Sequence, residues 1–200
     1  MLSLPDIELL FARHGASQYS GEAVTQLQHA LQTAHLAEQS DADDALVAAC
    51  LLHDLGHLLN QQGRDFNDTP SLRGIDDTHQ YHALPFLRGL LPDAVLDPIK
   101  LHVDAKRYLC CVNAGYFGRL SMDSKRSLAL QGGVFSEAQA AAFLSQNGAR
   151  EAVLLRQWDD LAKQDGLATP SLAHFLARAA RCVLSNAPPQ PPAPLPYAWP

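Results

Sequence analysis

The sequence predicts an all-α protein folded as a helical bundle. Alanine and leucine dominate its apolar residues, and both are strong helix formers. No stretch shows the alternation of apolar and polar β-branched residues that is typical of a half-buried strand. The run from Ala45 to Leu52 is apolar on nearly every side of a helix, which predicts a central, buried helix. With 200 residues, of which 47% are hydrophobic, the chain can bury a core without disulfides or a structural metal.

The N-terminal part of the chain is expected to hold three helices. A short helix comes first, over 3–13. Ser20-Gly21 then separates it from a second helix over 22–39, since glycine disfavours helix interiors. Asp41 is a candidate N-cap for the third helix, which contains the apolar run and ends near Asn60.

A long polar stretch divides the third helix from the rest of the bundle. Residues 61–77 are rich in glycine and aspartate, and they predict a loop long enough to act as a functional lid. Helices are expected beyond it over 78–90 and 93–112. Pro92 and Pro98 mark the start and the first turn of the latter, where proline is tolerated.

The C-terminal part is expected to be helical up to a proline-rich end. A turn region over 113–121 comes first, and the helices that follow it are expected over 122–130, 136–145, 148–165 and 170–185. Residues 187–200 contain seven prolines, which predict an extended tail. We therefore expect one helical domain over 1–186 and a separate tail.

Charge and cysteine content exclude several classes of protein. The net charge of −6 argues against a broad nucleic-acid interface, which needs clustered Lys and Arg. No apolar run reaches the length of a membrane span, and the N-terminus lacks the features of a signal peptide. The four cysteines show no CxxC spacing, which suits a reducing compartment. We expect a cytoplasmic protein without nucleic-acid or membrane partners; its oligomeric state is left open.

The strongest chemical signal is the pair His53-Asp54 inside the apolar segment LLHDLGHLL. A carboxylate buried beside an imidazole is costly unless its charge is compensated, and a metal ion is the simplest compensation. By itself such a pair is more often a set of satisfied polar groups. The wider pattern decides between these interpretations.

Further candidate ligands fall one to a predicted helix. They are His29, His79, His102 and Asp159. A helical bundle can point such side chains at one central place, and four imidazoles with two carboxylates suffice for two metals if Asp54 bridges them. A mixed nitrogen and oxygen set favours iron, manganese or zinc. His82 lies three residues after His79 and is an alternative ligand, although the register favours His79.

This order of ligands resembles the HD-domain superfamily of metal-dependent phosphohydrolases. Longer stretches are similar to one branch of it, the mixed-valent di-iron oxygenases that cleave organophosphonates. These stretches are YSGEAVTQLQHA (19–30), LLHDLGH (51–57), HVDAKRYLC (102–110), LALQGG (128–133) and RQWDDLAK (156–163). The resemblance covers most of residues 17–165 and implies an HD-type bundle with a di-metal site in its core.

The resemblance also implies a role for each residue of the site. Two iron ions, one Fe(II) and one Fe(III), would be bound. One would be held by His29, His53, Asp54 and Asp159, and the other by His79, His102 and the bridging Asp54. Tyr19 would occupy the second iron when substrate is absent, Glu22 would recognise a substrate ammonium, and His57 would lie near the substrate. Tyr19, Asp54 and His57 are thus the implied catalytic residues. The implied phosphonate ligands are Lys106, Ser124, Ser127, Gln131 and Arg156.

Helical spacing agrees with the positions of the two cationic groups. Lys106 lies four residues after His102, and Arg156 lies three before Asp159, so each shares a helix face with a candidate ligand. A phosphonate dianion needs such cations together with hydrogen-bond donors. Gly21 would let the loop that carries Glu22 open and close.

The function implied by the resemblance is an O2-dependent cleavage of the C–P bond of a small α-hydroxyphosphonate. The substrate would be 2-amino-1-hydroxyethylphosphonate or its N-methylated analogue, and the products phosphate and glycine or glycine betaine. One alternative is an HD-domain phosphohydrolase acting on a nucleotide or small phosphate ester, with the same ligands activating water. Another is a non-catalytic scaffold that binds a partner through the proline-rich tail.

Overall fold

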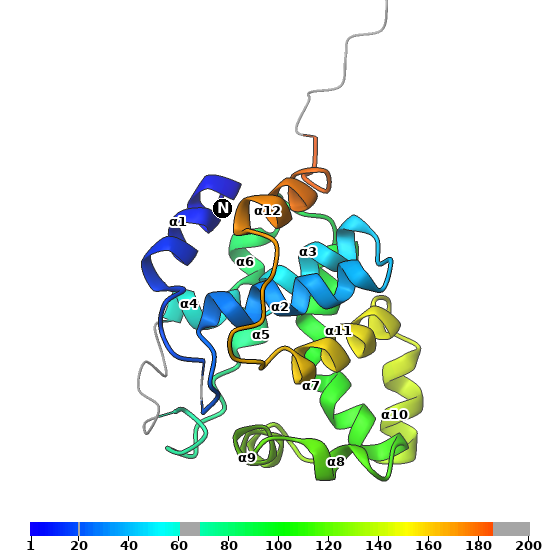
Figure 1. Ribbon diagram of the computed structural model, residues 1–200. Helices are drawn as coiled ribbons and strands as arrows, with labels where there is room; N and C mark the ends of the chain where they lie inside the picture. Colours follow the sequence, from blue (N-terminus) through cyan, green and yellow to red (C-terminus); the bar gives the residue numbers. More distant parts are fainter. Residues whose placement is uncertain (20, 61–68, 186–200) are drawn as a thin grey trace, which may run out of the picture.

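The computed structural model describes residues 1–19, 21–60 and 69–185, and over these ranges the chain is helical, with no named β-strand (Figure 1). The first part of the loop expected as a lid and the proline-rich tail lie outside the described residues. The helices are α1 (Leu4–His14), α2 (Gln26–Gln39), α3 (Asp44–Leu52), α4 (Leu55–Asn60), α5 (His79–His82), α6 (Leu84–Leu87), α7 (Asp93–Val112), α8 (Tyr116–Arg119), α9 (Met122–Leu130), α10 (Glu137–Leu144), α11 (Ala149–Leu161) and α12 (Leu172–Ala180).

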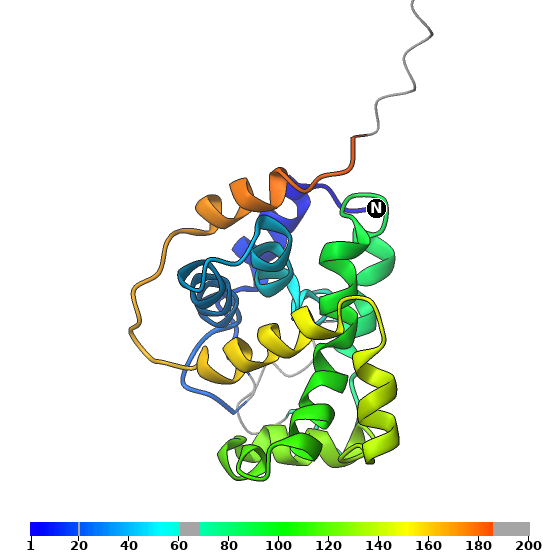
Figure 2. The same ribbon diagram turned by 90° about the vertical axis from the view of Figure 1, so that its right-hand side faces the viewer.

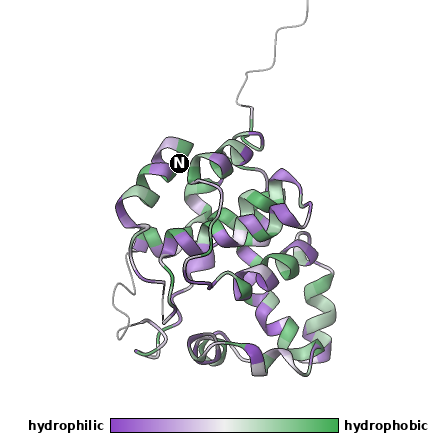
Figure 3. Cartoon of the chain, in the orientation of Figure 1, coloured by the Kyte–Doolittle hydropathy of each residue, from purple (hydrophilic) through white to green (hydrophobic). Residues whose placement is uncertain are grey.

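Helix α3 forms the centre of the bundle, as its apolar sequence predicts. It packs against α2, α7, α11 and α12. Figure 3 shows it as a run of hydrophobic residues, whereas α2 alternates between hydrophilic and hydrophobic ones. The two views in Figures 1 and 2 agree in placing α12 at one end of the molecule and α8 and α9 at the other. None of the described helices combines the length and the apolar character that a bilayer span requires.

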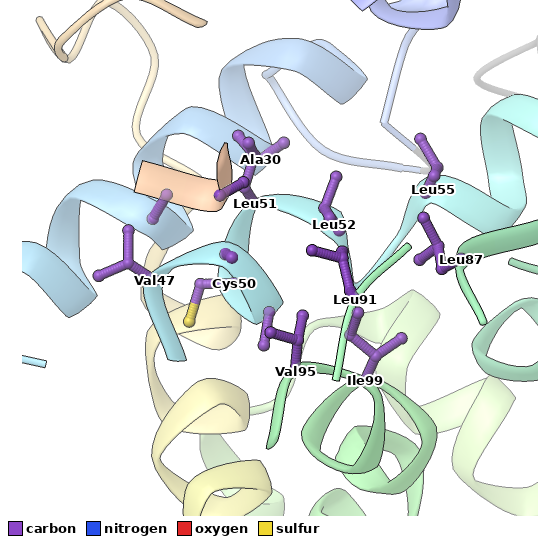
Figure 4. Close-up of a cluster of buried hydrophobic side chains, with 14 of the residues drawn as sticks. Ala30, Val47, Cys50, Leu51, Leu52, Leu55, Leu87, Leu91, Val95 and Ile99 are labelled. Atoms are coloured by element: carbon purple, nitrogen blue, oxygen red, sulfur yellow. The ribbon is translucent and has the colours of Figure 1, made fainter. Parts of the chain in front are cut away.

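The main apolar core lies between α3 and the start of α7. Leu51, Leu52 and Leu55 are fully buried, as are Val95 and Ile99. In Figure 4 the α3 side chains face those of α7 across this core. The continuous packing fixes α3 and α7 relative to each other, and with them His53 and Asp54 just after the end of α3 and His102 in the middle of α7.

Two predicted helix starts are wrong by a few residues, and capping explains both. Helix α2 begins after Thr25, whose hydroxyl accepts from the backbone N–H of Gln28 while the Gln28 side chain accepts from Thr25 N–H. Asp43 caps α3 through the backbone N–H of Leu46. Asp41 instead has a φ of 57° and terminates the preceding turn.

Two predicted helices are broken in the structure. The helix expected to end near residue 60 is interrupted at His53 and Asp54, which separate α3 from α4. The helix expected over 78–90 is two short helices, because Pro85 at the start of α6 cannot continue α5. The break at Asp54 aims its carboxylate at the centre of the ligand clusters described below.

The C-terminal helices are shorter than the sequence predicts. The expected turn region 113–121 contains α8, and α11 and α12 end at Leu161 and Ala180. The backbone N–H of Ala162 bonds back to the carbonyls of Trp158 and Asp159, which closes the end of α11. The chain that follows then turns towards α2.

Gly56 is required for the close approach of α4 and α5. A Cβ at this position would lie 2.1 Å from the carbonyl oxygen of His79, a contact with backbone that cannot rotate away. We expect Gly56→Ala to lower the free energy of unfolding by about 1–3 kcal/mol or more and to displace His79. Thermal unfolding followed by circular dichroism measures the loss. Gly118→Ala is the matched control, because a Cβ there meets no atom of the described part of the chain within 4 Å. An equal loss in both variants contradicts the prediction.

Candidate metal centre and substrate pocket

Six buried side chains from separate parts of the chain meet in the interior of the bundle. They are the six residues that the sequence predicts as metal ligands: His29 on α2, His53 and Asp54 at the α3–α4 break, His79 on α5, His102 on α7 and Asp159 on α11. They form two clusters, in each of which the potential ligand atoms lie within 4.8 Å of one another. The chain therefore carries a His/Asp metal-binding site.

The first cluster consists of His29, His53 and Asp159. The Nε2 atoms of the two imidazoles are 3.2 Å apart, and Asp159 Oδ1 lies 3.2 Å from His29 Nε2. Asp159 Oδ1 is buried, and none of the described residues donates a hydrogen bond to it. A buried carboxylate oxygen without a donor is costly unless a cation balances it.

The second cluster consists of Asp54, His79 and His102. The Nε2 atoms of its two imidazoles are 3.0 Å apart. Asp54 Oδ1 lies 3.3 Å from His79 Nε2, whereas Asp54 Oδ2 lies 3.4 Å from His53 Nε2 in the first cluster. Each oxygen of this one carboxylate thus faces a different cluster, which is the geometry of a bridging ligand.

The hydrogen bonds on the outer side of the four imidazoles fix their tautomers. Each Nδ1 donates to an oxygen, so each Nε2 presents a lone pair to the interior. The acceptors are the carbonyls of Ala162 for His29 (2.8 Å), Cys50 for His53 (2.8 Å) and Ile99 for His102 (2.7 Å), and the carboxylate of Asp77 for His79 (2.7 Å). Four converging lone pairs and two carboxylates repel one another, and bound cations remove this repulsion. The donor set therefore fits metal ions.

The electrostatics of the two clusters lead to the same conclusion. Burial disfavours a charged His53, but the Asp54 carboxylate outweighs it and raises the pKa of His53 to about 9. Burial also opposes ionisation of Asp54 and Asp159, yet the neighbouring imidazoles and, for Asp159, Arg156 hold both pKa values well below the usual range. The interior is thus built for two anions, which demand positive charge among them.

A cavity of about 60 Å³ opens beside the second cluster. Its lining includes every residue that the sequence predicts to contact substrate: Tyr19, Glu22, His57, Lys106, Ser124, Ser127, Gln131 and Arg156. Asp54, His79, His102 and Asp159 line the same cavity. A ligand bound there would touch both the cationic side chains and the candidate metal ligands.

Two buried cations face this cavity from opposite helices. Lys106 is 2% exposed, and its Nζ donates to Ser127 Oγ at 2.8 Å. Burial and the nearby Arg156 lower the pKa of Lys106 to about 7. Arg156 donates to Asp159 Oδ2 at 2.7 Å, to Tyr116 Oη at 3.3 Å and to Asp160. An anion in the cavity would supply the charge that stabilises both groups.

Tyr19 and Glu22 lie in the turn between α1 and α2 and not on a helix. The turn is closed by the hydrogen bond from Glu22 N to Tyr19 O (3.0 Å), and Gly21 within it has a φ of 71°, which favours glycine. The Tyr19 ring stacks on His29 with 3.9 Å between ring centroids. Burial and the Asp54 carboxylate raise the pKa of Tyr19 well above its usual value.

The sequence interpretation missed several residues of the site, including four that contact predicted site residues directly. Asp77 contacts His57 and His79, Asp160 and Tyr116 hold Arg156, and Lys163 pairs with Glu22. The sequence does place Asp77 two residues before a candidate ligand and Asp160 directly after another. Tyr116 comes from the expected turn region 113–121, where helical spacing gives no signal. Lys163 falls inside the helix expected over 148–165, but α11 ends at Leu161, so helical spacing does not describe its position. The alternative ligand His82 faces Thr78 and Asn60 and joins neither cluster.

Asp77 holds two imidazoles at once. Its Oδ1 accepts from His79 Nδ1 at 2.7 Å and its Oδ2 lies 3.2 Å from His57 Nδ1, while the two rings stack with centroids 4.2 Å apart. We expect Asp77→Asn to weaken metal binding at the second cluster by ten- to a hundredfold and to leave the first unchanged, since only the second loses its orienting carboxylate. Competitive metal titration separates the two affinities. The exposed neighbour Asp76→Asn is the control, and parallel losses at both clusters contradict the prediction.

The comparisons with known proteins agree with this architecture. The HD domain family model matches residues 27–129. A hydroxymethylphosphonate dioxygenase of Gimesia maris is 44% identical over 174 residues, covering 87% of this chain and 85% of the relative. A 1-hydroxy-2-(trimethylamino)ethylphosphonate dioxygenase (glycine-betaine-forming) of Leisingera caerulea is 34% identical over 178 residues, 87% of each chain. An uncharacterized protein of Acanthamoeba polyphaga mimivirus is 32% identical over 157 residues, 77% of this chain and 69% of the relative. The chain therefore belongs to the HD-domain family, in the branch that it shares with these phosphonate dioxygenases.

Proposed function

We propose that this protein is a dioxygenase that cleaves the C–P bond of a small α-hydroxyphosphonate. The observation that carries the proposal is the position of the cavity, which joins two buried cationic side chains to two clusters of metal ligands. The names of the two dioxygenase relatives support it. The partners of the reaction are then the hydroxyphosphonate and O2.

The cofactor that we propose is a pair of iron ions, one Fe(II) and one Fe(III). His29, His53 and Asp159 would hold one ion, His79 and His102 the other, and Asp54 would bridge them. When bound, such a pair supplies the redox chemistry that activates O2. The nitrogen and oxygen donors of both clusters suit iron.

The rest of the site positions the substrate. Lys106 and Arg156 would bind the phosphonate oxygens, with hydroxyl and amide donors from Ser124, Ser127 and Gln131 completing the anion site. Such binding would place the carbon that carries the hydroxyl beside Asp54 and the second cluster. Tyr19 stacks on His29 and would move when substrate enters. His57, held by Asp77, would lie against the substrate.

The proposed reaction is balanced without a further reductant. For hydroxymethylphosphonate, the substrate and O2 give formate and phosphate, and the carbon supplies all four electrons that O2 accepts. The two amine-bearing candidates, 2-amino-1-hydroxyethylphosphonate and its trimethylammonium analogue, would give glycine and glycine betaine by the same balance.

Phosphate release with and without O2 tests the proposal. Iron-loaded protein is incubated with hydroxymethylphosphonate and with both amine-bearing candidates. We expect phosphate only when O2 is present. Equal release in the absence of O2 would instead indicate a hydrolase, in line with the phosphohydrolases of the HD superfamily, and a panel of phosphate esters would then identify its substrate.

A further inference from the structure

We infer that Lys163 determines the substrate class, by occupying the Glu22 carboxylate so that the pocket takes hydroxyphosphonates that lack an ammonium group. The inference rests on the proposed function and deepens it. It makes hydroxymethylphosphonate the preferred substrate over 2-amino-1-hydroxyethylphosphonate and its trimethylammonium analogue. Glu22 then completes the pocket wall and does not recognise the substrate.

The ion pair between Lys163 and Glu22 is part of the cavity wall. Lys163 Nζ donates to Glu22 Oε1 at 3.0 Å, and both side chains line the cavity. They are shielded from solvent, with side-chain exposures of 14% and 16%. A substrate ammonium would have to displace an ammonium that the protein already supplies at the same oxygen, and the displaced lysine would lose its partner in a poorly solvated place.

The backbone on both sides of Lys163 is fixed to α2. The carbonyl of Ala162 accepts from His29 Nδ1 at 2.8 Å. The amide of Gln32, which is 1% exposed, donates to Gln164 O at 2.7 Å and accepts from Gln164 N at 3.0 Å. Lys163 therefore projects from a backbone segment that is held in place, and the fold positions its ammonium at Glu22.

Most other carboxylates around the cavity are also engaged. Asp77 is shared by two imidazoles, and Asp123 accepts from Thr69, Ser71 and Arg126. Asp54 and Asp159 belong to the metal clusters. Asp76 is exposed at the edge of the cavity, where water would compete for an ammonium. A primary ammonium thus finds no free buried carboxylate among the described lining residues.

A trimethylammonium group would meet the same difficulty. Such a group prefers an aromatic face, and Tyr19 is the one Phe, Tyr or Trp among the described lining residues. Its ring is stacked on His29, and Lys163 Nζ already lies 5.8 Å from its centroid. The 44% identical relative is named for a substrate without an amine, which agrees with this chemistry.

Substrate preference in Lys163 variants tests the inference. The iron-loaded wild type is compared with Lys163→Met, which keeps the stem and removes the charge, and with Lys163→Arg, which keeps the charge. We expect the wild type to prefer hydroxymethylphosphonate in kcat/KM. In Lys163→Met the preference should shift towards 2-amino-1-hydroxyethylphosphonate by roughly ten- to a hundredfold. Lys163→Arg should retain the wild-type preference.

Glu22 provides the matching control. Adding Glu22→Gln to Lys163→Met removes the freed carboxylate, so the gained preference should disappear. A wild type that prefers the amine-bearing substrate, or a Lys163→Met variant with an unchanged ratio, overturns the inference. Anaerobic calorimetric titration with 2-amino-1-hydroxyethylphosphonate gives a readout that does not depend on turnover: binding should tighten in Lys163→Met. Failure of the proposed function is distinct, since it shows as no O2-dependent phosphate from any hydroxyphosphonate.

Discussion

Asp54→Asn is expected to abolish the paired metal site and to lower the turnover at least a hundredfold. Asp54 faces both clusters through separate oxygens, and an amide offers only one oxygen and no negative charge. Removing a residue that only orients a metal ligand already lowers metal affinity or activity by about ten- to a hundredfold. Loss of the bridging ligand itself should lower them further. Metal content after anaerobic iron loading, measured by mass spectrometry beside phosphate release, tests the prediction.

The matched control for this variant is Asp165→Asn, an exposed aspartate beyond the end of α11. It should retain the metal content and turnover of the wild type. Circular dichroism shows whether the Asp54 variant still folds. A folded Asp54→Asn protein with two bound metal ions and wild-type turnover would contradict the bridging role.

Lys106→Met is expected to produce the second largest loss, in substrate binding. The variant keeps the buried stem and removes the ammonium that faces Ser127 and the anion site. Truncating one partner of a desolvated charge pair costs roughly thirtyfold or more in kcat/KM. The loss should appear mainly in KM, and steady-state kinetics with hydroxymethylphosphonate measures it. Lys100→Met, on the exposed side of the same helix, is the control.

The pH dependence of KM distinguishes a charged Lys106 from a merely structural one. Burial and Arg156 lower the pKa of Lys106 to about 7, so the ammonium that an anion needs is present below that pH and is lost above it. KM of the wild type should therefore rise as the pH increases through 7, and this rise should be absent in Lys106→Met. A wild-type KM that is flat between pH 6 and 8 would contradict the assignment.

Much of the fold follows from local sequence signals, and the errors have local causes. The apolar run in α3 predicts its central place because burial on every side leaves no other position for it. The start of a helix depends on which polar side chain accepts from a free backbone N–H. Thr25 and Asp43 do so at the starts of α2 and α3, whereas the sequence predicts starts at Gly21 and Asp41. The break at His53 and Asp54 contains neither glycine nor proline, and Gly56 follows it inside α4.

The candidate site shows a similar division. Lys106 and Arg156 lie on long helices; the family resemblance implies their roles, and helical spacing agrees because each shares a helix face with a candidate ligand. Lys163 comes from the chain just beyond a helix end, and its partner Glu22 lies 141 residues away. Only tertiary contacts bring such a pair together. The sequence therefore predicts a free carboxylate at Glu22, whereas the structure pairs it with Lys163.

The ratio of O2 consumed to phosphate released tests the central claim most directly. Iron-loaded protein is given hydroxymethylphosphonate in an oxygen electrode cell, and phosphate and the carbon product are measured in the same sample. We predict one O2 for each phosphate, with formate as the carbon product. Phosphate release without O2 uptake, with methanol as the carbon product, would mean that water and not O2 cleaves the bond, and would contradict the account.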